Sequence, residues 1–275
     1  MPEGDTIFRS ARTLHLALAD RVVTRFETVL PALRRVHEDR PIVGRTVEAV
    51  RAVGKHLLME ISGGLVLRTH MRMNGSWHIY RPEERWQRPR AALRIVVGNA
   101  DYVAIAFDVP VAEFLAAREL GRHRELASLG PDLLAADLDV AAVTARLRER
   151  PASAIADALL DQRTASGVGN VFKSEILFVC RIDPFRPVAT LSDDEARRIV
   201  ETSRELLRAN VITAERTGAP AWGGSRRTTR RMDPTARLWV YGRAGKPCRN
   251  CGTAVACRTQ GAHARLTYWC PRCQG

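Results

Sequence analysis

The sequence has no uninterrupted apolar run of about 18 residues, the shortest stretch that normally forms a membrane-spanning helix. Its opening residues, 1–5, are acidic and lack the basic and then apolar profile of a secretory signal peptide. The sequence contains no internal repeat. These absences predict an intracellular, cytoplasmic protein that has no membrane partner.

Lysine is scarce. It occurs only as Lys55, Lys173 and Lys246, so arginine provides forty of the 43 cations. Arginine stays charged at all ordinary pH values, whereas lysine can lose its proton and act as a nucleophile. Each of the three lysines is therefore a candidate for a specific role.

Acidic residues are outnumbered, because 30 Asp and Glu face 43 Lys and Arg and leave a net charge of +13. A chain this basic attracts polyanions, and nucleic acid is the first to consider. A basic surface without a dedicated ligand is the alternative. The apolar fraction of 45% is typical of a globular protein, and 275 residues are enough for two domains.

The first part of the chain predicts a helix followed by short strands. Apolar residues at helical spacing indicate an amphipathic helix over residues 5–19. Short β-branched runs separated by Gly or Asn turns cover residues 21–29, 45–53, 56–61, 65–70, 93–97 and 102–107. This pattern predicts a β-sandwich or barrel with flanking helices, in an N-terminal domain of residues 1–117.

The second part of the chain changes to helices after a Gly-, Arg- and His-rich linker, residues 118–131. Helical patterns cover residues 132–150, 152–161, 170–180 and 192–210. Residues 192–195 (SDDE) open the last of them with a capping box. Residues 217–237 lack an apolar period and predict a mobile loop within a domain of residues 132–237. The fold class is therefore α+β, with a cysteine-rich final domain of residues 238–275.

The cysteines form a metal-binding pattern. Cys248 and Cys251 make one C-x2-C pair, Cys270 and Cys273 make another, and eighteen residues separate the pairs. Each pair turns two thiolates towards one point, and four thiolates complete a closed tetrahedral zinc site. The intervening residues predict a hairpin, so the pattern indicates a zinc ribbon with one structural Zn²⁺ ion. Four unrelated free thiols are the alternative.

Proline directly follows the initiator methionine. Removal of Met1 leaves a secondary amine on Pro2, whose reference pKa near 8 makes it more often neutral and nucleophilic at pH 7 than a lysine. Attack of this amine on a sugar C1′ gives an iminium, which stays cationic and accepts electrons. Glu3 supplies a neighbouring carboxyl group for proton transfer. The pair is a candidate for covalent catalysis.

Four short stretches, spread over nearly the whole chain, belong together. They are MPEGD (residues 1–5), VGKHL (residues 53–57), a stretch running from DQ through GVGN to EIL (residues 161–177), and RLTYWCP (residues 265–271). In this order they resemble the N-terminus, the lysine turn, the helix–two-turns–helix motif and the distal half of the zinc finger of the formamidopyrimidine-DNA glycosylase family. The opening is most similar to the endonuclease VIII branch of that family.

The resemblance implies a reaction and a set of functional residues. A monomer would bind damaged DNA at the nucleoid, excise an oxidised base and cleave the strand by β/δ-elimination. Pro2 would form a Schiff base with the sugar, and Glu3 would donate and accept the proton at the deoxyribose ring. Lys55 would contact phosphate and assist strand cleavage. Asn170 and Arg265 would hold the phosphates that flank the flipped nucleotide.

Two loops bear on substrate recognition. Residues 70–76 (HMRMNGS) resemble the family loop that fills the gap left by an everted base, with Met73 suited to wedging between base pairs and His70 a candidate phosphate contact. A core methionine beside a turn is the alternative. Residues 108–113 (DVPVAE) lack the arginine that the purine-directed branch supplies to the orphaned base. We therefore predict oxidised pyrimidines as the preferred substrates.

Other readings stay open from the sequence. Taken alone, Lys55 is a surface cation, Asn170 a helix N-cap and Arg265 a hairpin cation. A non-catalytic damaged-DNA-binding protein of the same fold would not need a processed Pro2 or Glu3. A zinc-ribbon transcription or RNA-binding factor would not need them either. Their presence favours a bifunctional DNA glycosylase and AP lyase.

Overall fold

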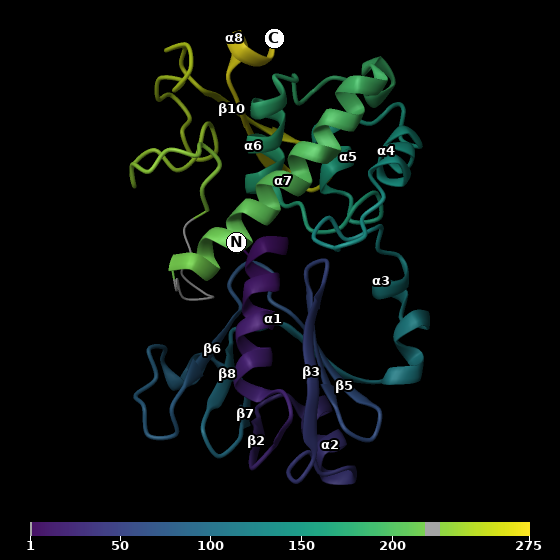
Figure 1. Ribbon diagram of the computed structural model, residues 1–275, viewed down its shortest axis with the longest axis vertical. Helices are drawn as coiled ribbons and strands as arrows, with labels where there is room; N and C mark the ends of the chain where they lie inside the picture. The colour runs from purple at the N-terminus through teal and green to yellow at the C-terminus, as the bar shows by residue number, and fades with distance from the viewer. Residues whose placement is uncertain (1, 218–225) are drawn as a thin grey trace. The chain divides into compact units, whose positions relative to one another are not determined.

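The computed structural model describes residues 2–217 and 226–275 (Figure 1). It divides the chain into two compact units, one built on Met1–Ser128 and the other on Leu129–Arg216 together with Ser225–Gly275. The change from one unit to the other falls inside residues 118–131, the predicted linker. No helix in these described ranges is both long enough and apolar enough to cross a bilayer.

Two antiparallel sheets make up most of the first unit (Figure 1). The five-stranded sheet has the order β1 (Arg21–Val22), β3 (Thr46–Val53), β4 (His56–Ile61), β5 (Leu65–His70) and β9 (Val111–Ala116). The four-stranded sheet has the order β2 (Arg25–Thr28), β7 (Leu93–Gly98), β8 (Val103–Phe107) and β6 (Ser76–Tyr80). The expected run over residues 21–29 is two separate strands, and β6 and β9 were not predicted.

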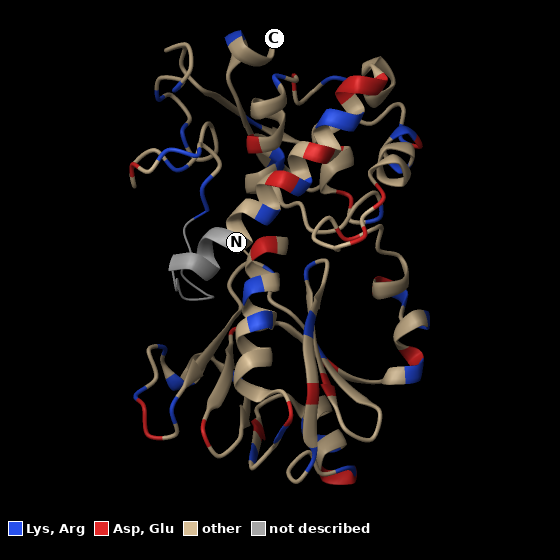
Figure 2. Cartoon of the chain, in the orientation of Figure 1, with Lys and Arg blue, Asp and Glu red and all other residues tan. Residues whose placement is uncertain are grey.

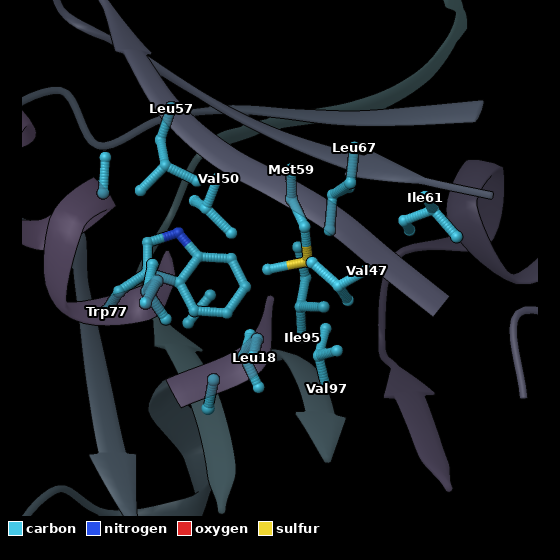
Figure 3. Packing of buried hydrophobic residues seen from close by; sticks show 14 of the residues in the cluster. Leu18, Val47, Val50, Leu57, Met59, Ile61, Leu67, Trp77, Ile95 and Val97 are labelled. Carbon is cyan, nitrogen blue, oxygen red and sulfur yellow. The ribbon is translucent and has the colours of Figure 1, made fainter. Parts of the chain in front are cut away.

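One hydrophobic core joins the two sheets, because alternate residues of each strand point to the same face. Leu57 and Met59 of β4 and Ile95 and Val97 of β7 belong to this core, and Trp77 closes it on one side (Figure 3). Burial of each such side chain stabilises the fold by roughly 1.5–3 kcal/mol. The sandwich is therefore a rigid support for the turns at its ends.

Helix α1 (Gly4–Leu18) packs on β3 and runs antiparallel to it. Ala19, directly after the helix, forms a bridge with Val47, and the backbone N–H of Val50 donates to Nδ1 of His15 over 3.2 Å. Positions nearer the start of α1 therefore lie beside positions nearer the end of β3.

The remaining helices of the first unit are short. They are α2 (Pro31–Asp39), η1 (Arg90–Ala92), η2 (Ala117–Arg122) and α3 (Arg124–Ala127). Helix α3 lies within the predicted linker, and η2 begins one residue before it, so the linker is partly helical. Helix α2 was not predicted because Pro31 begins it and only Leu33 of its side chains is fully buried.

The second unit is helical with a terminal hairpin. Its elements are α4 (Val140–Arg148), α5 (Ile155–Leu160), α6 (Asn170–Cys180), η3 (Val188–Thr190), α7 (Asp193–Thr217), β10 (Ala256–Gln260), β11 (Arg265–Trp269) and α8 (Pro271–Gln274). The capping box is present, since Ser192 N–H donates to Oε2 of Glu195 over 2.8 Å and Glu195 N–H donates to Oγ of Ser192 over 3.1 Å. The predicted start of α7 is correct, but the helix continues past residue 210.

The expected helix over residues 132–150 is wrong in its first half. Asp132 Oδ1 accepts the N–H of Leu134 in a turn, and Asp139 Oδ1 accepts the N–H of Ala142 as the N-cap of α4. Short acidic side chains compete with helical backbone bonds in this way. The helix therefore begins only at Val140.

The predicted mobile loop, residues 217–237, lies partly outside the described residues, which resume at 226. Residues 226–237 form neither helix nor strand. The N–H of Arg227 donates to Oδ1 of Asn210 on α7, and the N–H of Thr228 donates to the carbonyl of Arg237. This described part is thus tied to α7 and to itself.

Candidate active site and metal centre

Pro2 and Glu3 lie at the start of α1. Glu3 is the N-cap residue, and its carbonyl accepts the N–H groups of Thr6 and Ile7 over 2.9 and 3.0 Å. The Glu3 side chain is fully buried, and Pro2 before it is half-buried. A carboxylate at this end of a helix is favoured by the helix dipole. Met1 lies outside the described residues.

Lys55 lies in the tight turn between β3 and β4. Gly54 supplies the positive φ of 58° that this turn requires. The bridge between Ala19 and Val47 is a common reference point for the two elements. Glu3 is sixteen residues before Ala19, about 24 Å along the helix at 1.5 Å per residue. Lys55 is eight residues after Val47, about 26 Å along the strand. Because the two elements are antiparallel neighbours, Glu3 and Lys55 are at the same end of the sandwich.

His70 belongs to the same end of the first unit. It pairs across β4 and β5 with His56, and the two rings meet edge to face with centroids 4.7 Å apart. Burial, with the neighbouring Arg72 and Lys55 cations, lowers the pKa of His70 to about 4. Its Nδ1 accepts the N–H of Arg72 over 3.1 Å. The neutral ring therefore carries its proton on Nε2, which suits donation to a phosphate oxygen.

Met73 lies at the tip of the loop that follows His70. Its side chain is 54% exposed, whereas that of Met71 is buried. The loop is tight, because a Cβ on Gly75 would come within 2.5 Å of the Met71 carbonyl oxygen. The exposure of Met73 excludes the alternative of a core methionine and leaves an apolar side chain in solvent.

The helix–two-turns–helix motif of the second unit consists of α5, residues 161–169 and α6. Gln162 fastens its turns by donating to the carbonyls of Leu160 and Val168 and by accepting the N–H of Gly167, which has φ of 116°. Gly169, and not Asn170, is the N-cap of α6. The start of α6 therefore has no side-chain cap, and helix N-termini of this kind are a common place for anions to bind.

Asn170 lies close to Arg265 in the structure because its side chain bonds to the carbonyl of the next residue, Leu266. Nδ2 of Asn170 donates to the carbonyl of Leu266 over 2.9 Å, and exposed Arg265 precedes Leu266 on β11. The amide has two hydrogens, of which this contact uses one. The sequence separates these residues widely, but the hairpin lies against the start of α6.

Two buried charged residues of α6 were not assigned a role from the sequence. Nζ of Lys173, which is 1% exposed, donates to Oγ1 of Thr267 over 2.8 Å and to the Leu266 carbonyl over 3.3 Å. Glu175 is fully buried. The signal in the sequence is the presence of charges on the buried faces of an otherwise apolar helix.

The carboxylate of Glu175 organises the chain that enters the zinc ribbon. Oε1 accepts the N–H groups of Val240 and Tyr241 over 2.9 and 2.8 Å, and Oε2 accepts the N–H of Trp239 over 2.8 Å together with the hydroxyl of Thr228. Burial raises the pKa of this carboxyl group. Four donors from one segment thus converge on one side chain.

The four cysteines of the predicted zinc site form one cluster, with all Sγ atoms within 4.8 Å of one another. Cys248 Sγ lies 4.0 Å from Cys273 Sγ, and Cys251 Sγ lies 3.4 Å from Cys270 Sγ. A tetrahedral zinc with bonds of 2.3 Å requires sulfur atoms about 3.8 Å apart. The donor set and spacing therefore fit a zinc ion.

Basic side chains occur on both units. Figure 2 shows Lys and Arg along α1 and along the chain that precedes the zinc ribbon. This distribution offers phosphate contacts over several elements and not on one helix alone.

Comparison with known proteins identifies the family. Residues 1–122 match the formamidopyrimidine-DNA glycosylase N-terminal domain, and residues 129–219 match the formamidopyrimidine-DNA glycosylase H2TH domain. A Streptomyces coelicolor protein named probable endonuclease 8 2 is 42% identical and covers 100% of this chain and 94% of its own length. The DNA-(apurinic or apyrimidinic site) lyase Nei2 of Mycolicibacterium smegmatis is 38% identical, with 100% of this chain and 99% of that protein covered.

Solved structures share the fold. A complex of Lactococcus lactis Fpg with DNA containing an abasic site superposes with a TM-score of 0.84 at 21% identity, covering 100% of both chains. MutM bound to DNA containing carbocyclic 8-oxo-G gives 0.83 at 21% identity, covering 99% of both. The predicted α+β fold class is confirmed, and the chain belongs to the formamidopyrimidine-DNA glycosylase family.

Proposed function

We propose that this chain is a bifunctional DNA glycosylase and AP lyase of base excision repair that acts on oxidised pyrimidines. The observation that carries the proposal is the arrangement at one end of the sandwich, where Pro2 and buried Glu3 begin α1 and Lys55 occupies the adjacent hairpin turn. The family membership and the names of the relatives support the same activity. Chromosomal DNA as substrate places the protein in the bacterial cytoplasm, at the nucleoid.

The chemistry uses the secondary amine of Pro2 after removal of Met1. The Pro2 nitrogen attacks C1′ as the bond to the damaged base breaks, and Glu3 delivers a proton to the sugar ring so that the ring opens to an iminium. The iminium then draws electrons as a proton leaves C2′ and the 3′ phosphate is expelled. Lys55, close to the sugar phosphates, assists this elimination.

Phosphate binding involves residues of each unit. In the first, Lys55 and the neutral ring of His70 offer N–H donors. In the second, Asn170 and Arg265 offer donors around the Leu266 carbonyl. Such contacts position the strand and carry no sequence preference. We propose that they hold the phosphates beside the flipped nucleotide while Met73 fills the vacated stack.

The pyrimidine preference is supported by the connection from β8 to β9. Asp108 there is held by Arg88 and, at 3.6 Å, by Arg94, and Val109 is buried. Residues 108–113 contain no arginine that could reach an orphaned base. Saturated pyrimidines also stack poorly, so flipping them requires less free energy.

The metal proposed for the four-cysteine cluster is one zinc ion with a structural role. Four thiolates leave no open coordination position, so the ion supplies no bond to substrate. Its role is to hold the hairpin of β10 and β11, and with it Arg265, against α6.

Borohydride trapping on DNA containing an abasic site tests the nucleophile. The wild-type protein should form a covalent complex, and Pro2→Gly or a retained Met1 should abolish or greatly weaken it, because a primary or blocked amine replaces the proline nitrogen. Intact-mass analysis should show a chain without Met1. Trapping that survives complete blocking of the N-terminus would assign the Schiff base to a lysine such as Lys55. A protein that binds damaged DNA but is never trapped would be the non-catalytic alternative.

Glu3→Gln separates the two activities. It should remove excision of a damaged base, which needs a proton at the sugar ring, and retain much of the lyase activity on an abasic sugar, which already opens to an aldehyde. Equal loss of both activities would make Glu3 a structural residue.

Single-turnover rates on paired substrates test the lesion class. Thymine glycol, dihydrouracil and abasic sites should be cut faster than 8-oxoguanine opposite cytosine. Faster excision of 8-oxoguanine would overturn the pyrimidine preference and leave the Pro2 mechanism standing.

A further inference from the structure

A polar cluster occupies the face of the five-stranded sheet that points away from the hydrophobic core. Leu57 and Leu67 point into the core, so their strand neighbours His56 and Arg68 point to the other face. Arg68 is also directly opposite Glu113 of β9. Polar residues on three adjacent strands therefore meet on one surface.

Arg68 is the centre of this cluster, and only 2% of its side chain is exposed. Nε and Nη2 donate to Nδ1 of His56 over 3.2 and 3.0 Å. Nη1 donates to Glu113, and Nη2 also donates to Glu125 of α3. One guanidinium thus makes four hydrogen bonds to three side chains from three elements, which the planar fork of arginine permits and the single ammonium of lysine does not.

The contact defines the state of His56. Its Nδ1 accepts hydrogen bonds from a cation, so the ring is neutral with its proton on Nε2. Burial, then the neighbouring His70, Arg68, His123 and Arg72, lower its pKa to about 2. The carboxylates of Glu113 on β9 and Glu125 on α3 lie on the other side of this contact, against Arg68, and Nε2 of His123 is 3.2 Å from Glu113.

His56 lies between the two proposed phosphate contacts of the first unit. It directly follows Lys55 in the chain and begins β4, and its ring packs edge to face on that of His70. A rotation of the His56 ring would therefore disturb the His70 ring directly, at the residue where the Lys55 turn enters β4.

We propose that Arg68 is a positioning residue for the phosphate contacts of Lys55 and His70, because it fixes the ring of His56 between them. This assignment rests on the proposed function, which gives Lys55 and His70 their roles. Arg68 touches neither substrate nor the reacting atoms. Glu113 and Glu125 balance its charge and fix the plane of its guanidinium.

Arg68→Met tests the assignment, because methionine keeps much of the length and removes every donor. Strand cleavage at an abasic site should slow on the order of tenfold in single turnover, the equivalent of one lost charge-assisted hydrogen bond. Arg51→Met is the matched control, since Arg51 is on β3 of the same sheet, pairs with Glu60 and is 46% exposed. Its rate should stay within about twofold of wild type, as for other surface ion pairs.

The pH profile distinguishes positioning from general destabilisation. In the wild type, His56 and His70 stay neutral above pH 5, so neither contributes a change of rate between pH 5 and 8. In Arg68→Met, Glu113 and Glu125 lose their cation and favour protonation of His56 and His70. The ratio of the variant's rate to the wild-type rate should therefore change as the pH falls from 8 to 5.5, measured where both proteins are folded.

A second variant covers the case in which Arg68→Met does not fold. His56→Phe keeps a ring of similar shape and removes the acceptor, so it should slow cleavage as much as Arg68→Met, and the double variant should be no slower than either. Nitrogen NMR of the free wild-type protein should show His56 protonated on Nε2 at pH 7. A wild-type rate in either variant, an unchanged pH profile, or the Nδ1 tautomer would overturn the assignment. If wild type forms no Schiff base, the proposed function fails, and the NMR result alone decides the Arg68 contact.

Discussion

Replacement of Glu175 by glutamine should destabilise the second unit more than any surface change. Each carboxylate oxygen accepts two donors, Val240 and Tyr241 on Oε1 and Trp239 and Thr228 on Oε2. The glutamine NH₂ in place of Oε2 can donate to the Thr228 hydroxyl, which turns to accept it, so the Trp239 N–H is the buried donor that loses its acceptor. Each unsatisfied buried group costs about 1–3 kcal/mol, so the expected loss is about 1–3 kcal/mol, a substantial part of a total of roughly 5–15 kcal/mol.

The assay is urea unfolding of the zinc-loaded protein, followed by far-UV circular dichroism, with zinc release recorded by a colorimetric chelator. Glu175→Gln should unfold at lower urea and release zinc before the rest of the unit unfolds, because residues 239–241 lead directly into the metal site. Glu201→Gln on α7 is the control, since Glu201 is exposed and its change should stay within about 0.5 kcal/mol. A loss below about 1 kcal/mol for Glu175→Gln would show that these four contacts do not organise the zinc ribbon.

Three further predictions concern the metal, the loop and pH. Cys273→Ser should reduce bound zinc, measured by metal analysis, from one ion per chain to none. It should also weaken DNA binding, measured by fluorescence anisotropy, because the hairpin no longer holds Arg265 in place. Full-strength DNA binding without zinc would contradict this prediction. Met73→Ala should leave the urea midpoint unchanged, since the side chain is 54% exposed, and slow base excision from duplex DNA more than cleavage of a single-stranded abasic site; equal slowing would argue against wedging. Arg186 and the Ser192 N–H lower the pKa of Glu195 from 4.5 to about 2, so its contribution is complete above pH 4.5 and is lost as the pH falls towards 2. With the carboxylate 24% exposed, Glu195→Gln should cost about 2 kcal/mol at pH 7. A gap in urea midpoint that is as wide at pH 2.5 as at pH 7 would refute the ion-pair account.

Local sequence patterns were sufficient to predict those features that depend only on residues near one another in the chain. The capping box at Ser192, the exact bounds of α6 and the four-cysteine cluster all follow from residue types at fixed spacings. The start of α4 was missed because Asp132 and Asp139 bond to backbone groups that a periodic pattern does not reveal.

The buried hydrogen bonds of Arg68 and Glu175 could not be predicted from the sequence. Arg68 reads as one of forty arginines, and only the register of β4, β5 and β9 brings it to His56, Glu113 and Glu125. Glu175 was part of a motif, but its donors come from residues more than fifty positions later. Long-range hydrogen bonds of this kind depend on tertiary packing, and a single sequence contains no periodic signal for them.

Because α1 packs antiparallel on β3, the number of residues in the helix sets both the distance of the N-terminal amine from the end of α1 and its direction around the helix axis. One residue inserted between Glu3 and His15 would move the N-terminal amine about 1.5 Å along the helix axis and turn it by about 100°. The contacts of His15 with Val50 and of Ala19 with Val47 fix the C-terminal end of α1 on β3, so the added residue would displace the other end of the helix. For the proposed Pro2 nucleophile, the length of α1 therefore matters as much as the identity of the residue.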